Sequence, residues 1–206
     1  MAPKYKLVYF DARGRAEPAR WVLAYAGVDY EDHRIPKDQW PTLKSTAPFG
    51  QVPYLEVDGK PLPQSLSLTR YLARQHKLVG KDDWEAAQAD ALVDYVQDSL
   101  KPLMAIFHEQ DEGKKSKLKE AFVKEQIQPY LQGLERKLQE NNNGDGFFIG
   151  SGPTWADFVV VVALDGILGM ESTLLDKFPK LKAHNQRVHE LKGIKEWIAK
   201  RPNTPM

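Results

Sequence analysis

The hydrophobic pattern of the chain changes near residue 80, and this change constrains the fold more than any other feature. Before it, short segments of strand composition alternate with segments of helical spacing. After it, almost all apolar residues recur at helical spacing. The sequence therefore predicts an α/β domain over residues 1–78, a linker over residues 79–82, and an all-helical domain over residues 83–206.

The first domain alternates strand and helix signals. Asp58-Gly59 is a strong hairpin signal after an apolar segment. The expected strands cover residues 5–10, 28–35 and 52–57, with a further strand near Leu62, and the expected helices cover residues 15–26 and 65–76. A β-α-β unit followed by a hairpin and a helix predicts a mixed sheet of the type βαβ-ββα.

The second domain has one ambiguous segment. The expected helices cover residues 84–108, 117–139, 180–191 and 193–200. Pro129 is expected to kink or interrupt the second of them. The β-branched run Val159–Val162 fits a buried strand as well as a helix. We favour a helix because Thr154 and Asp157 have capping-box spacing just before this run, and we expect this pair to serve folding and not chemistry.

Composition excludes several classes of function. The formal net charge is +1, so the chain lacks the positive charge typical of a nucleic-acid-binding protein. It has no cysteine, which excludes disulfides, a cysteine nucleophile and thiolate zinc sites. The start of the chain shows no signal-peptide pattern, and the longest apolar run, Phe158–Leu164, is too short to span a membrane. We expect a cytoplasmic protein.

Three features of the first domain suggest a binding site. Tyr9 lies at the end of the first strand, where ligand sites in open α/β sheets tend to occur. Val52-Pro53 is an X-Pro bond, the only common place for a cis peptide. Gln64-Ser65 starts a helix, whose free N–H groups attract anions. Each feature alone also has a structural explanation, such as helix capping by Gln64-Ser65, so the inference depends on their joint occurrence.

A set of motifs resembles the glutathione transferases. The motifs are Tyr9-Phe10, Arg13-Gly14-Arg15-Ala16-Glu17, Trp40-Pro41 with Lys44, Pro48-Phe49-Gly50-Gln51-Val52-Pro53, and Gln64-Ser65. The resemblance covers the whole chain and is greatest to the sigma class, which includes prostaglandin D synthases, and to the similar nematode transferases. It implies a thioredoxin-like first domain with a cis Val-Pro peptide, an all-helical second domain, a homodimer, and glutathione as co-substrate.

The resemblance also implies roles for individual residues. Tyr9 and Arg15 would be catalytic, and Val52 would pair through its backbone with the cysteinyl part of glutathione. Gln64 and Ser65 would bind the γ-glutamyl carboxylate. The complete implied glutathione site is Tyr9, Phe10, Arg15, Trp40, Lys44, Gly50, Gln51, Val52, Pro53, Gln64, Ser65 and, from the second copy in the dimer, Asp98.

The implied chemistry has a direct physical basis. A cysteine-like thiol has a pKa of ~8.5, so only a few per cent of it is thiolate at neutral pH. A hydroxyl group that donates a hydrogen bond to the sulfur stabilises the thiolate and lowers that pKa. Tyr9 would supply this hydroxyl, and Arg15 would add positive potential. The thiolate would then attack a small hydrophobic electrophile held close to it.

The second substrate is expected to bind between the loop after Tyr9 and the first long helix. The candidate residues are Arg13, Gly14, Met104, Ala105 and His108. Prostaglandin D synthases carry a tryptophan in this part of the helix, whereas residues 102–107 contain none, which argues for a more open pocket. Three alternatives stay open: a glutathione-dependent prostaglandin isomerase, a protein that sequesters haem or other apolar ligands, and a structural protein of the crystallin type.

Other charged groups have simpler explanations. One helix face carries three acidic residues at four-residue spacing, Asp90, Asp94 and Asp98, and we expect them to form a solvated stripe. No metal site is expected there, because Gln97 interrupts the acidic cluster. The five histidines are scattered, and we interpret them as structural or surface residues. The basic run 114–119 is interpreted as a solvated helix start.

Overall fold

The structure is a computed structural model that describes residues 3–204, apart from the side chains of Met104 and Phe107. By its contacts the chain divides into two compact units. One unit combines the residues up to Val79 with those from His189 onward, and the other covers residues 80–188. The sequence predicted that the second domain extends to residue 206, whereas the contacts group the segment from His189 onward with the first unit. The domain boundaries themselves stay a prediction.

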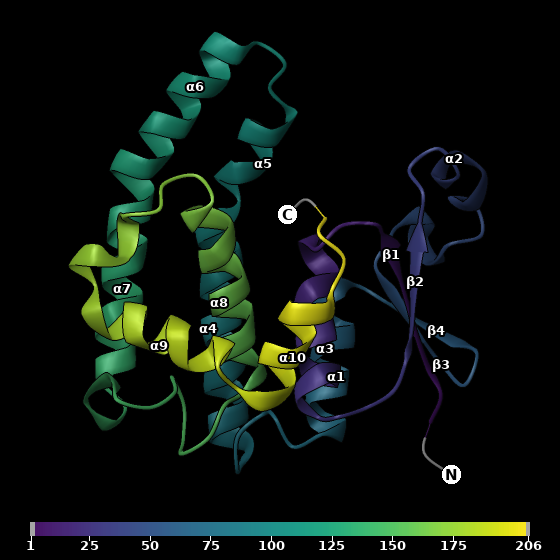
Figure 1. Cartoon of the computed structure of the whole chain (residues 1–206), viewed down its shortest axis with the longest axis horizontal. Helices are drawn as coiled ribbons and strands as arrows, with labels where there is room; N and C mark the ends of the chain where they lie inside the picture. Colours follow the sequence, from purple (N-terminus) through teal and green to yellow (C-terminus); the bar gives the residue numbers. More distant parts are fainter. Residues whose placement is uncertain (1–2, 205–206) are drawn as a thin grey trace. The chain divides into compact units, whose positions relative to one another are not determined.

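The first unit contains a mixed sheet with the strand order β2-β1-β3-β4. Its strands are β1 (Tyr5–Phe10), β2 (Glu31–Ile35), β3 (Tyr54–Val57) and β4 (Lys60–Pro63). β1 pairs with β2 in parallel, whereas β3 pairs with β1 and β4 in antiparallel fashion (Figure 1). The βαβ-ββα order predicted from the sequence is therefore confirmed.

The strand boundaries show where local patterns are insufficient. The second strand begins at Glu31, opposite Lys6 of β1, and not at the expected residue 28. The third begins at Tyr54 and not at residue 52, after a cis Val52–Pro53 peptide. The hairpin is as expected, because Asp58 and Gly59 both have positive φ and Val57 pairs with Lys60. This is the geometry of a two-residue type I′ turn.

In the first unit, two helices pack against a third. The helices of this unit are α1 (Glu17–Tyr25), α2 (Trp40–Leu43), α3 (Ser65–Gln75) and α10 (Lys192–Lys200), with 3₁₀ turns at Gly14–Ala16 and Pro48–Gly50. α1 packs against both α3 and α10 (Figure 1). Trp21 and Leu72 are completely buried in this unit. The four-residue α2 was not predicted, since it is too short to show a helical period.

The second unit is helical throughout its regular elements. Its helices are α4 (Asp83–Leu100), α5 (Pro102–His108), α6 (Glu112–Ala121), α7 (Gln128–Gln139), α8 (Trp155–Leu168) and α9 (Pro179–His189), with a π-helical turn at Phe122–Ile127 and 3₁₀ turns at Asn142–Gly144 and Leu174–Lys177. The expected single helix over residues 84–108 is wrong, because it breaks before Pro102, which has no amide N–H. The expected interruption near Pro129 takes the form of the π-helical turn just before α7.

The ambiguous segment Val159–Val162 lies in the middle of α8 and is helical. This helix packs against α4 and is buried on nearly all sides, which explains why it shows little periodicity. The predicted capping box is present at its start, where Asp157 accepts hydrogen bonds from the Thr154 amide at 2.7 Å and the Thr154 hydroxyl at 2.9 Å. Among the described residues no helix is long and apolar enough to cross a membrane.

Candidate functional site

Tyr9 is the penultimate residue of β1, and its side chain is half-buried. The chain then forms a short loop and the 3₁₀ turn Gly14–Ala16, which leads directly into α1. This turn brings the backbone amide of Arg15 to the phenol, where it donates a hydrogen bond of 3.3 Å to the Tyr9 hydroxyl oxygen. An oxygen that already accepts a hydrogen bond can direct its own hydrogen to another acceptor.

Gly14 lies against the Tyr9 hydroxyl. Its φ is +40°, in a region that favours glycine, and a Cβ at this position would lie 2.7 Å from the hydroxyl oxygen. Gly14 was predicted from the sequence to line the substrate pocket. The structure shows that it also leaves room for the catalytic candidate, and no local sequence pattern revealed this contact.

An aromatic row extends from Tyr9. The Phe10 ring lies between those of Tyr9 and Trp40, with centroid distances of 5.4 Å on both sides. The contact with Trp40 is edge-to-face, which is a favourable arrangement for aromatic rings. Trp40 is the first residue of α2, so this short helix attaches to the end of β1 through the row. Three residues predicted for the glutathione site are thereby brought together.

The remaining predicted glutathione residues come from the segments around β3 and β4. Lys44 and Gln51 are exposed, and a Cβ on Gly50 would lie 3.6 Å from the Lys44 carbonyl oxygen. The Gln64 side chain donates a hydrogen bond of 3.4 Å to that of Gln51. Gln64 has a φ of +73°, an unusual conformation for a residue other than glycine, and it caps α3 immediately before Ser65. The free N–H groups of this helix start can donate hydrogen bonds to an anionic group.

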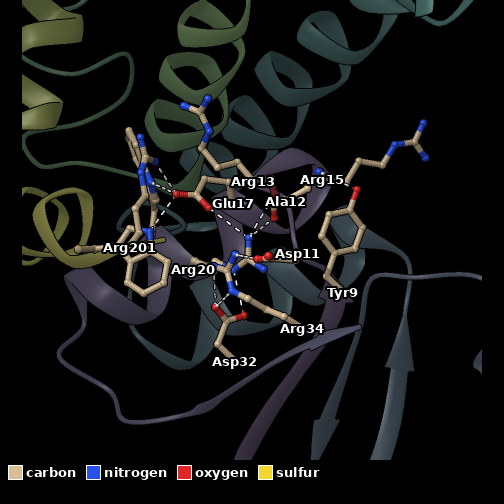
Figure 2. A network of polar contacts seen from close by, with 12 residues as sticks. Tyr9, Asp11, Ala12, Arg13, Arg15, Glu17, Arg20, Asp32, Arg34 and Arg201 are labelled. Carbon is tan, nitrogen blue, oxygen red and sulfur yellow. Dashed lines mark hydrogen bonds and ion pairs between the residues drawn. The ribbon is translucent and has the colours of Figure 1, made fainter. Parts of the chain in front are cut away.

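Behind the loop lies a network of arginine and carboxylate side chains that the sequence analysis did not identify (Figure 2). We call it the arginine–carboxylate network, and it consists of Asp11, Glu17, Arg20, Asp32, Arg34 and Arg201. Arg20 and Glu17 are 0% and 1% exposed. One signal could have revealed them: Arg20 follows Ala19 on the apolar face of the predicted helix, where an arginine is out of place.

Glu17 connects this network to the C-terminal helix. Its carboxylate accepts hydrogen bonds from Trp21 Nε1 at 3.1 Å, Trp197 Nε1 at 2.9 Å and Arg201 Nη1 at 2.7 Å. Burial acts to raise the pKa of the Glu17 carboxyl, but the hydrogen bonds from Trp197 and Arg201 and the charge of Arg20 outweigh it. The pKa of Glu17 therefore lies below its ordinary value, and the group is a buried carboxylate.

Arg13 lines a cavity of about 350 Å³ in the first unit. The other lining residues are Ile198, Ala199, Arg201, Pro202, Asn203 and Thr204. Figure 2 shows the Arg13 side chain directed away from the arginine–carboxylate network. Its Nε is buried without a hydrogen-bond partner in the described part of the chain. Arg13 thus faces a different environment from Gly14, although both were predicted to line the substrate pocket.

Four predicted site residues belong to the second unit. Asp98 is an exposed residue of α4, and its carboxylate pairs with Lys101 at 2.7 Å. Ala105 and His108 are exposed residues of α5. Met104 is also in α5, but its side chain lies outside the described residues. Their participation in one site with Tyr9 stays a prediction. Within residues 3–204, no group of three His, Cys, Asp or Glu side chains could hold a metal ion.

Comparison with known proteins identifies the family. Residues 5–74 match the glutathione S-transferase N-terminal domain, and residues 97–201 match the C-terminal domain. The chain is 41% identical to probable glutathione S-transferase 7 of Caenorhabditis elegans, with 98% of each chain covered. It is 42% identical to hematopoietic prostaglandin D synthase of Gallus gallus, again over 98% of each chain.

Solved structures agree with these matches. The structure of prostaglandin synthase D of Nilaparvata lugens superposes with a TM-score of 0.89 at 40% identity, covering 97% of this chain and 99% of that one. The first unit thus has the thioredoxin-like sheet expected from the resemblance, and the helical part matches the family's C-terminal domain. This chain belongs to the glutathione S-transferase family and is sigma-like.

Proposed function

We propose that this transferase conjugates the thiolate of glutathione to small hydrophobic electrophiles, and that Tyr9 stabilises the thiolate. The observation that carries the proposal is the environment of the Tyr9 hydroxyl. Its oxygen accepts the Arg15 amide hydrogen, and Gly14 has no side chain to block it. The hydroxyl hydrogen is then available for a sulfur acceptor, and the hydrogen bond received by the oxygen makes it a better donor.

Glutathione would lie along the segments that follow Tyr9 in the first unit. Val52 lies outside the paired residues of β3, which begin at Tyr54, and its backbone groups would pair with the cysteinyl part of an extended glutathione. Gln64 and Ser65 at the start of α3 would hold the γ-glutamyl carboxylate. Trp40, Lys44 and Gln51 would hold the glycyl end. The hydrogen bond between Gln51 and Gln64 supports a single continuous site.

We also propose a homodimer in which Asp98 approaches the glutathione of the other copy. Asp98 is exposed, which leaves its carboxylate accessible to a second chain. Its ion pair with Lys101 is exposed at both ends and therefore weak enough to be exchanged for an ammonium group of glutathione. Light scattering of the purified protein tests the dimer directly. A cytoplasmic location is part of the same proposal.

A similar protein suggests a second candidate function. Hematopoietic prostaglandin D synthase of Gallus gallus is 42% identical to this chain, so glutathione-dependent prostaglandin isomerisation is a specific alternative. Residues 102–107 contain no tryptophan, which supports a more open pocket and general conjugation. Parallel assays with a prostaglandin endoperoxide and with chlorodinitrobenzene distinguish the two activities. A much higher kcat/KM for the endoperoxide would favour the isomerase.

The central experiment compares wild type with Tyr9→Phe in the conjugation of glutathione to chlorodinitrobenzene. If Tyr9 stabilises the thiolate, its loss should lower kcat/KM by roughly 10- to 100-fold, as expected when a thiol pKa returns toward its free value. Ultraviolet titration of bound glutathione should show the thiol pKa rising by about one to two units in the variant. Equal turnover in both proteins would remove Tyr9 from this role.

Tyr5→Phe is the matched control. Tyr5 lies on the same strand, and its substitution also removes a hydroxyl group. This hydroxyl is buried and has no hydrogen-bond partner in the described structure. Its removal should leave turnover unchanged. No turnover in the wild type would instead favour sequestration of haem or other apolar ligands, which binding titrations with such ligands would then detect.

A further inference from the structure

The loop between Tyr9 and Gly14 is held in place by side chains of other elements. Arg20 Nη1 donates to the carbonyl oxygens of Ala12 and Arg13 at 2.8 and 3.3 Å. Arg34 Nη1 binds the carboxylate of Asp11 at 2.9 Å. Every residue from 11 to 13 therefore has a polar contact with a guanidinium group, and Figure 2 shows these contacts converging below the loop.

Arg20 is itself fixed on several sides. Its Nε donates to Asp32 at 3.1 Å, and its Nη1 pairs with Glu17 at 3.2 Å. Its side chain is completely buried, so water does not compete for these contacts. The charges of the network balance, because the arginines 20, 34 and 201 face the carboxylates 11, 17 and 32. A buried charge that loses its partners is strongly destabilising, so a displacement of Arg20 would be costly.

The anchored carbonyl groups lie close in sequence to the donor that contacts Tyr9. Only Gly14 separates Arg13, whose carbonyl binds Arg20, from Arg15, whose amide binds the Tyr9 hydroxyl. A displacement of the Arg13 carbonyl would therefore move the Arg15 amide as well. Gly14, between them, lies against the hydroxyl, so the backbone of this turn is close to the group that it would position.

We infer that Arg20 is a positioning residue for catalysis: it fixes the loop that sets the Tyr9 hydroxyl, and Glu17 couples this anchor to helix α10 through Trp197 and Arg201. The inference rests on the proposed role of Tyr9. Arg20 touches neither the proposed substrate nor the reacting sulfur, and acts through the Ala12 and Arg13 carbonyls. Helix α10 thereby helps to hold the loop that positions the Tyr9 hydroxyl.

Arg20→Lys is the first test, measured in the intact protein with glutathione and chlorodinitrobenzene. Lysine keeps the positive charge beside Glu17 and Asp32 but cannot hold two carboxylates and two carbonyls in one planar arrangement. We expect kcat to fall about tenfold, the KM for glutathione to change less than about twofold, and the thiol pKa of bound glutathione to rise. A purely structural role would lower the melting temperature and leave the thiol pKa unchanged.

Arg187→Lys is the matched control. Arg187 also holds a loop carbonyl, that of Gly146 at 2.7 Å, but in the second unit. The Arg187→Lys substitution should lower the stability of the protein without changing the thiol pKa of bound glutathione. Folded Arg20→Lys protein with a wild-type kcat and thiol pKa would overturn the inference.

Glu17→Gln provides a second test of the positioning role if Arg20→Lys is too unstable to assay. Glutamine has nearly the same shape but removes the charge that pairs with Arg20 and Arg201. We expect a smaller rise of the same thiol pKa, and an unchanged value would overturn the inference. Failure of the proposed function is distinguishable, since wild type itself would then not lower the thiol pKa of bound glutathione.

Discussion

Two buried carboxylates at helix starts, Glu17 of α1 and Asp157 of α8, are stabilised in different ways. Asp157 is 0% exposed and is satisfied by amide, hydroxyl and imidazole groups, including the Phe148 amide at 3.0 Å and His184 Nε2 at 2.8 Å. Glu17 is 1% exposed and is satisfied by Arg20, Arg201 and two indoles. Both gain from the positive end of their helix.

The difference lies in how far the partners are in the sequence. Thr154, which gives two of the hydrogen bonds to Asp157, is three residues away, whereas Trp197 and Arg201 are 180 and 184 residues from Glu17. The Asp157 site joins the start of α8 to Phe148 and, through His184, to α9, all within the second unit. The Glu17 site joins the loop after Tyr9, α1 and α10. We therefore expect substitutions at Asp157 to affect stability alone and substitutions at Glu17 to affect stability and catalysis.

Asp157→Ala should have the largest effect on stability. It leaves the amides of Phe148 and Thr154 and the Thr154 hydroxyl without their buried acceptor, and each unsatisfied group costs about 1–3 kcal/mol. We expect the free energy of unfolding to fall by about 4 kcal/mol in urea titrations. The turnover of the remaining folded protein should be unchanged. Asp176→Ala, which removes an exposed ion pair with Lys182, is the control and should change little.

Glu17→Gln should have a smaller effect on stability but a clear one on catalysis. It leaves Arg201 without its charged partner and Arg20 with Asp32 alone, and we expect a loss of roughly 2–3 kcal/mol by urea titration. Turnover should fall together with stability. A stability loss accompanied by full turnover would show that Glu17, like Asp157, contributes to stability alone.

Gly14→Ala tests the loop that the Glu17 site supports. Gly14 and Gly27 both have positive φ, so alanine at either position should cost about 1 kcal/mol of stability. Only at Gly14 does the new methyl group meet the Tyr9 hydroxyl, whereas nothing lies within 4 Å of a Cβ at Gly27. Turnover should therefore fall in Gly14→Ala and not in Gly27→Ala. An equal loss of turnover would show that backbone strain, and not the contact, is responsible.

The smallest expected effect is on the pH dependence of stability. The pKa of Glu17 in the folded protein lies below its ordinary value of 4.5, so the unfolded chain binds the proton more tightly. The contribution of Glu17 is therefore complete above about pH 4.5 and is lost as the pH falls through its folded-state pKa. Urea titrations between pH 6 and 3, roughly, should show a shallower decline in Glu17→Gln than in wild type. Parallel curves would contradict the assignment.

Much of the molecule could be predicted from local patterns. The alternation of strand and helix signals predicted the mixed sheet, Asp58-Gly59 predicted its hairpin, and Thr154 with Asp157 predicted a buried helix where the apolar run alone was ambiguous. These features depend on residues within a few positions of each other. The family resemblance of the motifs around Tyr9 was also a property of the sequence, and the domain matches confirm it.

Other features depend on residues that are far apart in the chain and meet only in the folded protein. Helix propensity predicted α1 but gave no reason for Arg20 on its apolar face, because its partners Ala12 and Asp32 lie outside the helix. The sequence likewise could not show that a Cβ at Gly14 would meet the Tyr9 hydroxyl, or that Trp197 and Arg201 reach Glu17. A buried charge requires its partners in three dimensions, and no spacing in the sequence records their positions.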